Sequence, residues 1–100
     1  MKTIKLGICG LGTVGSGTVN VLTASGEAIN RRAGATLEIA HIGARRDNAL
    51  CDTTGIKVSR DIFAVVDDSE IDILIELIGG TTVAKELVER AIKAGKHVVT

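Results

Sequence analysis

The 100-residue sequence contains no proline, tryptophan or tyrosine, and its single phenylalanine is Phe63. Without more aromatic side chains it cannot build the stacking platform on which proteins bind single-stranded nucleic acid. The 12 Lys and Arg residues balance the 12 Asp and Glu residues, so no net charge attracts nucleic acid or an anionic membrane. The sequence also has no apolar run of about 18 residues, the length of a membrane-spanning helix. We therefore expect neither nucleic acid nor a membrane as a partner.

Cysteine is also scarce, with only Cys9 and Cys51 present. The two lie far apart and neither belongs to a Cys-x-x-Cys pair, so the sequence predicts no metal site and no disulfide framework. Cys9 is expected to be a small buried apolar residue. The amino-terminal segment is too rich in glycine for a signal peptide, and we expect a reduced protein in the cytoplasm. His41 and His97 fall away from the carboxyl ends of predicted strands, so neither is expected to be catalytic.

Apolar residues make up 45% of the sequence and charged residues 24%, as in a folded globular domain. Short β-branched runs alternate with segments of helical periodicity, which predicts an α/β fold with parallel strands. The predicted strands span 3–9, 37–43, 57–59, 71–78 and 96–100, and the predicted helices span 13–24, 27–32, 62–66 and 84–92. We expect residues 1–100 to form one Rossmann-type domain, an open, twisted and mainly parallel sheet with helices on both faces.

Three local patterns refine this prediction. The expected buried face of helix 13–24 consists of residues at helical spacing, namely Val14, Thr18, Val21 and Leu22. Asp61 precedes a short apolar helix and is expected to cap it. Residues 71–78 are apolar almost throughout, which predicts a central strand covered on both faces.

The first predicted strand runs into a glycine motif, G-x-G-x-x-G, which is followed by the first predicted helix. This context is the one in which the motif binds a dinucleotide, because amide groups at a helix amino terminus can face a pyrophosphate without a side chain between them. The alternative is a glycine-rich turn without a ligand. The predicted cofactor-binding residues of the motif are Gly10, Leu11, Gly12, Thr13, Val14 and Gly15.

The end of the second predicted strand reads Gly43-Ala44-Arg45-Arg46-Asp47. An acidic residue at this place binds the ribose hydroxyls of NAD, whereas Arg binds the 2′-phosphate of NADP. Arg45 and Arg46 therefore favour NADP(H), with NAD(H) as the alternative if Asp47 takes the ribose instead. Lys57 could reach the same phosphate from the third strand. The competing interpretation treats all three cations as ordinary surface charges.

Gly79, Gly80 and Thr81 follow the fourth predicted strand at its carboxyl end, where a glycine pair allows close approach to the nicotinamide half of a cofactor. A loop made only for turning is the alternative. Glu76, within the apolar run before this loop, is expected to orient the glycine-rich loop or to cap the next helix, and neither role is catalytic.

Several of these segments together resemble a known family. Residues 5–17 (KLGICGLGTVGSG), 43–47, 71–80 (IDILIELIGG) and 94–100 (AGKHVVT) are similar to the amino-terminal domain of homoserine dehydrogenases. The resemblance implies NAD(P)-dependent interconversion of aspartate 4-semialdehyde and homoserine, in the biosynthesis of threonine, methionine and isoleucine. It also implies a homo-oligomeric full-length enzyme with a small-molecule substrate. Carried over by position, Gly79 and Thr100 would lie near the nicotinamide.

The chain ends at the carboxyl end of its last predicted strand, where the catalytic groups of open α/β sheets begin. We therefore expect the family's dimerisation and substrate regions to be absent, assign no catalytic residue, and expect no dehydrogenase activity from the chain alone. One alternative is a non-enzymatic module that senses NAD(P)H. Another is the first domain of a different semialdehyde or amino-acid dehydrogenase.

Overall fold

A single sheet of five parallel strands, in the order β3-β2-β1-β4-β5, organises the chain. The structure is a computed structural model that describes residues 2–79 and 82–100. The strands are β1 (Thr3–Cys9), β2 (Thr36–Gly43), β3 (Lys57–Ser59), β4 (Ile73–Glu76) and β5 (His97–Val99). The helices are α1 (Thr13–Ala24), α2 (Gly26–Ala33), α3 (Ile62–Val66) and α4 (Thr82–Lys93).

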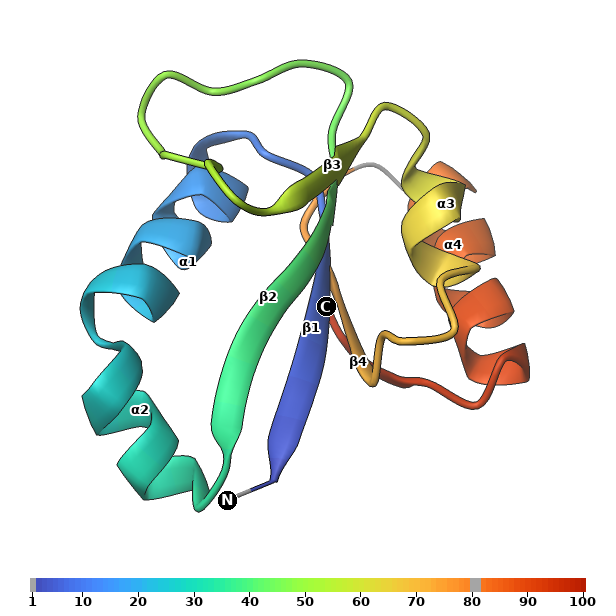
Figure 1. Ribbon diagram of the computed structural model, residues 1–100. Helices are drawn as coiled ribbons and strands as arrows, with labels where there is room; N and C mark the ends of the chain where they lie inside the picture. The colour runs from blue at the N-terminus through green and yellow to red at the C-terminus, as the bar shows by residue number, and fades with distance from the viewer. Residues whose placement is uncertain (1, 80–81) are drawn as a thin grey trace.

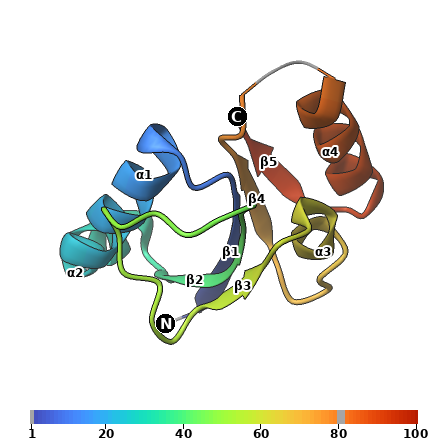
Figure 2. The same cartoon turned by 90° about the horizontal axis from the view of Figure 1, so that it is seen from above.

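The helices cover both faces of the sheet. Helices α1 and α2 lie on one face, and α3 and α4 lie on the other (Figure 1). Viewed from above, the sheet separates these two helical layers (Figure 2). All strands run parallel and the order reverses direction between β1 and β4, so the predicted α/β fold with a Rossmann-type sheet is confirmed.

The strand residues alternate between two apolar cores, as the two-residue period of a strand requires. On β1, Cys9 belongs to the core under α3 and α4, and Ile8 to the core under α1. On β4, Leu74 and Ile75 divide in the same way, so β4 is covered on both faces. This confirms the central strand predicted from the apolar run.

That strand is nonetheless shorter than the predicted 71–78. Just beyond β4, the backbone N–H of Leu77 still donates to the carbonyl of Cys9 on β1, at 2.8 Å. The carboxylate of Glu76 then accepts the N–H of Ile78 at 2.9 Å, which turns the chain out of the sheet. Glu76 therefore orients the loop after β4, one of its two predicted roles.

The buried face of α1 differs from the prediction. Val14 and Val21 are exposed, and the buried residues are Gly15, Ser16 and Val19. The helix lies so close to the end of β1 that only small residues fit at its first turn, so the contact face there carries no large apolar side chain. The other two predicted residues, Thr18 and Leu22, are half-buried, and Leu22 packs against the core under α1, so apolar periodicity located the buried face only in part.

The predicted capping role of Asp61 is confirmed. The carboxylate of Asp61 accepts the backbone N–H of Phe63 at 3.0 Å and caps α3. His41 is buried within the sheet and bonds two side chains, Asp68 at Nδ1 (2.8 Å) and Ser59 at Nε2 (2.7 Å). His41 thus has a structural role. Among the helices that the structure describes, none is long and apolar enough to cross a membrane.

Candidate nucleotide-binding site

A cleft of about 800 Å³ opens at the carboxyl ends of β1, β2 and β4. This place lies at the topological switch between β1 and β4, where open α/β sheets bind their ligands. Its volume suits a cofactor-sized molecule. The cleft is lined by Gly10, Leu11, Gly12, Gly43, Ala44, Arg45, Arg46, Asp47, Asn48, Ile62, Leu77, Ile78, Gly79, Thr82 and Val83.

The glycine turn forms the floor of the cleft. Gly10 has a φ of +105°, and a Cβ there would lie 2.8 Å from the carbonyl carbon of Leu77. A Cβ on Gly15 would overlap the carbonyl oxygen of Gly10, so α1 and the turn can meet only without side chains. A Cβ on Gly12, by contrast, would meet nothing within 4 Å. The motif therefore has two glycines required for packing and a third that leaves open space.

The amino terminus of α1 begins at this open glycine. Gly12 is the residue that caps the helix, and no side chain within the described residues accepts its first N–H groups. Thr13 and Val14 follow in the first turn, are exposed, and do not line the cleft. A helix amino terminus without a side-chain cap, with its dipole directed outwards, is a site for an anion such as a pyrophosphate.

The loop after β2 forms one wall of the cleft and places Arg45, Arg46 and Asp47 along it, all exposed. Asn48 joins this wall to the glycine turn, because its Nδ2 donates to the carbonyl of Leu11 at 3.0 Å. The longer loop that continues from Asn48 to β3 contacts α1 beyond its first turn, where Nδ2 of Asn20 donates to the carbonyl of Leu50 at 2.8 Å. The two predicted arginines are thus next to the predicted pyrophosphate site.

Lys57 is not brought to the cleft. It is at the amino end of β3, paired in register with His41, whereas the cleft opens at the carboxyl ends. The backbone N–H of Glu70 is the main cause of the lowered pKa of Asp68, and the charge of Lys57 adds to this lowering. The cation that follows β3 at the correct end is Arg60, whose guanidinium contacts Ala44 and Asp47. Sequence reasoning missed Arg60, although its place after β3 matches the place of Arg45 after β2.

The opposite wall comes from the loop after β4 and the start of α4. Gly79 lines it, with a φ of +72°, together with Thr82 and Val83, which sequence reasoning did not select. The predicted Gly80 and Thr81 lie outside the described residues. Thr100 is exposed beyond β5 and does not line the cleft.

A single carboxyl group lies among the described residues that line the cleft. It belongs to Asp47, which is ion-paired with Arg60. Cys9 lies buried below the turn, where burial, together with the charge of Glu76, raises the pKa of its thiol to about 12. Within the described residues, no group of three or more His, Cys, Asp or Glu could hold a metal ion. The arrangement can bind and orient an anionic ligand.

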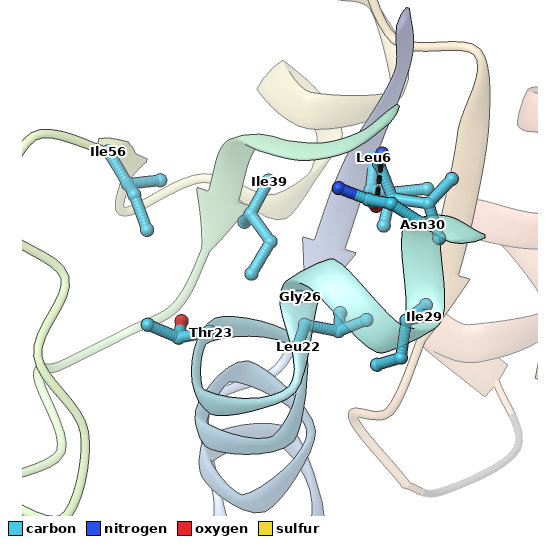
Figure 3. A pocket seen from close by; sticks show the side chains of 9 residues that line it. Leu6, Leu22, Thr23, Gly26, Ile29, Asn30, Ile39 and Ile56 are labelled. Atoms are coloured by element: carbon cyan, nitrogen blue, oxygen red, sulfur yellow. Dashed lines mark hydrogen bonds between the residues drawn. The ribbon is translucent and has the colours of Figure 1, made fainter. Parts of the chain in front are cut away.

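A second, smaller cavity of about 220 Å³ lies between α1 and α2 and the sheet. Leu22 and Ile29 approach it from the helices, and Leu6 and Ile39 from the strands (Figure 3). None of the described residues that line it carries a charge, so it does not suit a nucleotide phosphate.

Comparison with known proteins decides the family. Residues 10–100 match the family described as "Homoserine dehydrogenase, NAD binding domain". The chain belongs to the homoserine dehydrogenase family. The matched range includes the whole glycine motif, both walls of the cleft and every strand except β1.

Individual family members agree closely with this chain. Homoserine dehydrogenase of Pseudomonas aeruginosa is 58% identical over the whole chain, and that of Methylobacillus glycogenes is 52% identical. The crystal structure of a homoserine dehydrogenase from Thiobacillus denitrificans superposes over 100% of the chain with a TM-score of 0.90, at 48% identity. The chain spans about a quarter of the length of the curated relatives it matches, 23% and 25%.

Proposed function

We propose that this chain is the nucleotide-binding part of a homoserine dehydrogenase and that it binds NADP(H) in preference to NAD(H). The observation that carries the proposal is the amino terminus of α1, which lacks a side-chain cap and begins at Gly12 beside a cleft of about 800 Å³. In the proposed complex the first amide groups of α1 donate to the pyrophosphate. Gly12 has open space on its Cβ side, so the pyrophosphate can come close to the backbone.

The preference for NADP(H) rests on the wall after β2. Arg45 and Arg46 line the cleft there, and guanidinium groups bind phosphate by paired, charge-assisted hydrogen bonds. We assign the 2′-phosphate to Arg45, with Arg46 as a second contact. Lys57 is left out of this assignment because it is at the amino end of β3.

The nicotinamide half of the cofactor is assigned to the opposite wall, near Gly79, with Thr100 beyond the end of β5. When bound, the nicotinamide would exchange hydride with the carbonyl carbon of aspartate 4-semialdehyde. This chain's own residues bind and orient the cofactor and carry no acid–base step. We further propose that the whole enzyme acts in the cytoplasm as a homo-oligomer, in the synthesis of threonine, methionine and isoleucine.

A matched pair of glycine variants tests the nucleotide site. In Gly12→Ala the added methyl occupies the space proposed for the pyrophosphate, and calorimetry should show NADPH binding weakened by roughly tenfold or more. Gly17→Ala places the same methyl in open space further along α1. Its NADPH affinity should equal that of the unmodified chain. Circular dichroism would verify that both variants are folded.

Two results would contradict the proposal. One is a folded, unmodified chain that shows no heat of binding with either NADPH or NADH at millimolar concentration. The other is an equal loss of affinity in Gly12→Ala and Gly17→Ala, because the two glycines belong to the same helical end but only Gly12 lines the cleft.

A further inference from the structure

Arg60 follows β3 and reaches across to the loop that forms the arginine wall of the cleft. Its Nη1 donates to the carbonyl oxygen of Ala44 at 3.3 Å, and its Nη2 donates to Oδ1 of Asp47 at 2.9 Å. Ala44 is buried at the start of this loop and Asp47 is exposed further along it, so Arg60 contacts both the buried and the exposed part of the loop. Arg60 itself does not line the cleft. It therefore contacts the residues of the wall without lining the cleft itself.

Asp47 is the group at this wall that could favour the other nucleotide. Among the described residues that line the cleft, it is the only one with a carboxylate. A carboxylate after the second strand accepts hydrogen bonds from the ribose hydroxyls of NAD and repels a 2′-phosphate. Asp47 comes directly after Arg45 and Arg46 in the same loop. The choice of nucleotide thus depends on whether this carboxylate is available.

We propose that Arg60 is a specificity-determining positioning residue, which favours NADP(H) by holding the carboxylate of Asp47 away from the ribose. The inference rests on the proposed nucleotide site and adds a residue that does not contact the ligand. The guanidinium of Arg60 donates a hydrogen bond to Oδ1 of Asp47, and its positive charge offsets the negative charge of that carboxylate. Arg45 and Arg46 then present their charge to a 2′-phosphate without a free carboxylate beside them.

The exposure of the pair sets the expected size of the effect. The side chain of Arg60 is 55% exposed and that of Asp47 is 72% exposed. Exposed ion pairs contribute little to folding, so variants of either residue should fold. The same weakness limits the change in nucleotide preference to roughly threefold to fivefold, which calorimetry resolves.

The test measures NADPH and NADH affinities of the full chain and four variants by calorimetry. Arg60→Met should lower the preference for NADPH over NADH by roughly threefold to fivefold, because Asp47 becomes free to accept from the ribose. In the double variant Arg60→Met with Asp47→Asn, the preference should return to that of the unmodified chain or exceed it. Asp47→Asn alone should retain or increase the preference. Arg31→Met is the charge-matched control, an exposed arginine on α2, and should leave the ratio unchanged.

Each outcome decides the role of Arg60. If Arg60→Met leaves the ratio unchanged, Arg60 does not determine specificity. If the double variant loses NADPH affinity as much as Arg60→Met does, Arg60 contacts the phosphate itself and does not act through Asp47. In both cases NADPH still binds and the proposed function stands. An unmodified chain that binds neither nucleotide would overturn the proposed function and this inference together.

Discussion

At the scale of single residues, the two cysteines differ in how far their thiols are buried. Cys9 is fully buried, and its Sγ is 3.7 Å from the carbonyl oxygen of Ile62. Cys51 is half-buried in the loop between β2 and β3, where partial burial and the charges of Asp52 and Asp47 raise the pKa of its thiol. Both thiols are therefore protonated near neutral pH, and only Cys51 is accessible to a reagent.

This difference predicts selective alkylation. At pH 8, iodoacetamide should label Cys51 slowly and Cys9 not at all, because the pKa of Cys9 is raised to about 12 and its side chain has no exposed surface. Mass spectrometry of tryptic peptides would measure both rates. In urea the two cysteines should react at similar rates. Equal labelling in the folded chain would show that Cys9 is not enclosed as described.

At the scale of a single element, helix α1 both packs against the sheet and supplies the proposed binding site for the pyrophosphate. Its first turn meets the end of β1 without side chains, at Gly15, and its free amino end faces the cleft from Gly12. Val14 and Val21 are consequently on the outer face, at 64% and 58% exposure. The helix is placed by close backbone contact more than by a broad apolar face.

A methyl group at Gly15 should therefore damage the fold. Gly15→Ala is expected to destabilise the chain by about 2 kcal/mol or more, because its Cβ would overlap the carbonyl oxygen of Gly10 and neither backbone segment can move freely. Gly17→Ala, exposed in the same helix, should stabilise the chain by about 0.5 kcal/mol. Urea unfolding would measure both. Changes of the same sign in the two variants would contradict this account.

At the scale of the whole molecule, polar contacts that are partly buried join segments far apart in the sequence. His41 of β2 links Ser59 of β3 to Asp68, in the segment between α3 and β4. Lys96, just before β5, donates from Nζ to the backbone carbonyls of Asp68 and Ile71 at 2.8 and 3.1 Å. The segment around Asp68 thus connects the edge strand β3 with the residue that precedes β5.

Acid should weaken this connection. The backbone N–H of Glu70 holds the pKa of Asp68 below its usual value, with a further contribution from His41, against the opposing effect of burial. A lowered folded pKa means that Asp68 stabilises the fold above about pH 4, and that this contribution disappears as the pH falls through the folded pKa.

Asp68→Asn should accordingly destabilise the chain by about 1 kcal/mol at pH 7, and the difference from the unmodified chain should shrink below pH 4. Urea titrations from pH 2 to pH 8 would measure it. Glu86→Gln is the control, since Glu86 is exposed on α4 and its carboxylate makes no hydrogen bond or ion pair among the described residues. A constant difference across the pH range in Asp68→Asn would contradict the role given to the ionised carboxylate.

The sequence by itself determined the succession of strands and helices, the parallel α/β class and the glycine motif. These features depend on local properties: apolar period, β-branched runs, and the conformational demands of Gly10, whose φ is +105°. The capping role of Asp61 is also local, because the acceptor and the donor are two residues apart. For such features neighbouring residues carry the information.

Only the tertiary structure decided which groups meet at the cleft and that small residues form the contact at the start of α1. Lys57 and Arg60 are three residues apart in sequence, yet only Arg60 leaves β3 at the carboxyl end and contacts the arginine wall. Gly15 and Val19 face the sheet because α1 approaches the carbonyl of Gly10 closely, and no apolar period encodes that distance. The physical reason is the same in both cases: the contact joins segments that the sheet, and not the local chain, brings together.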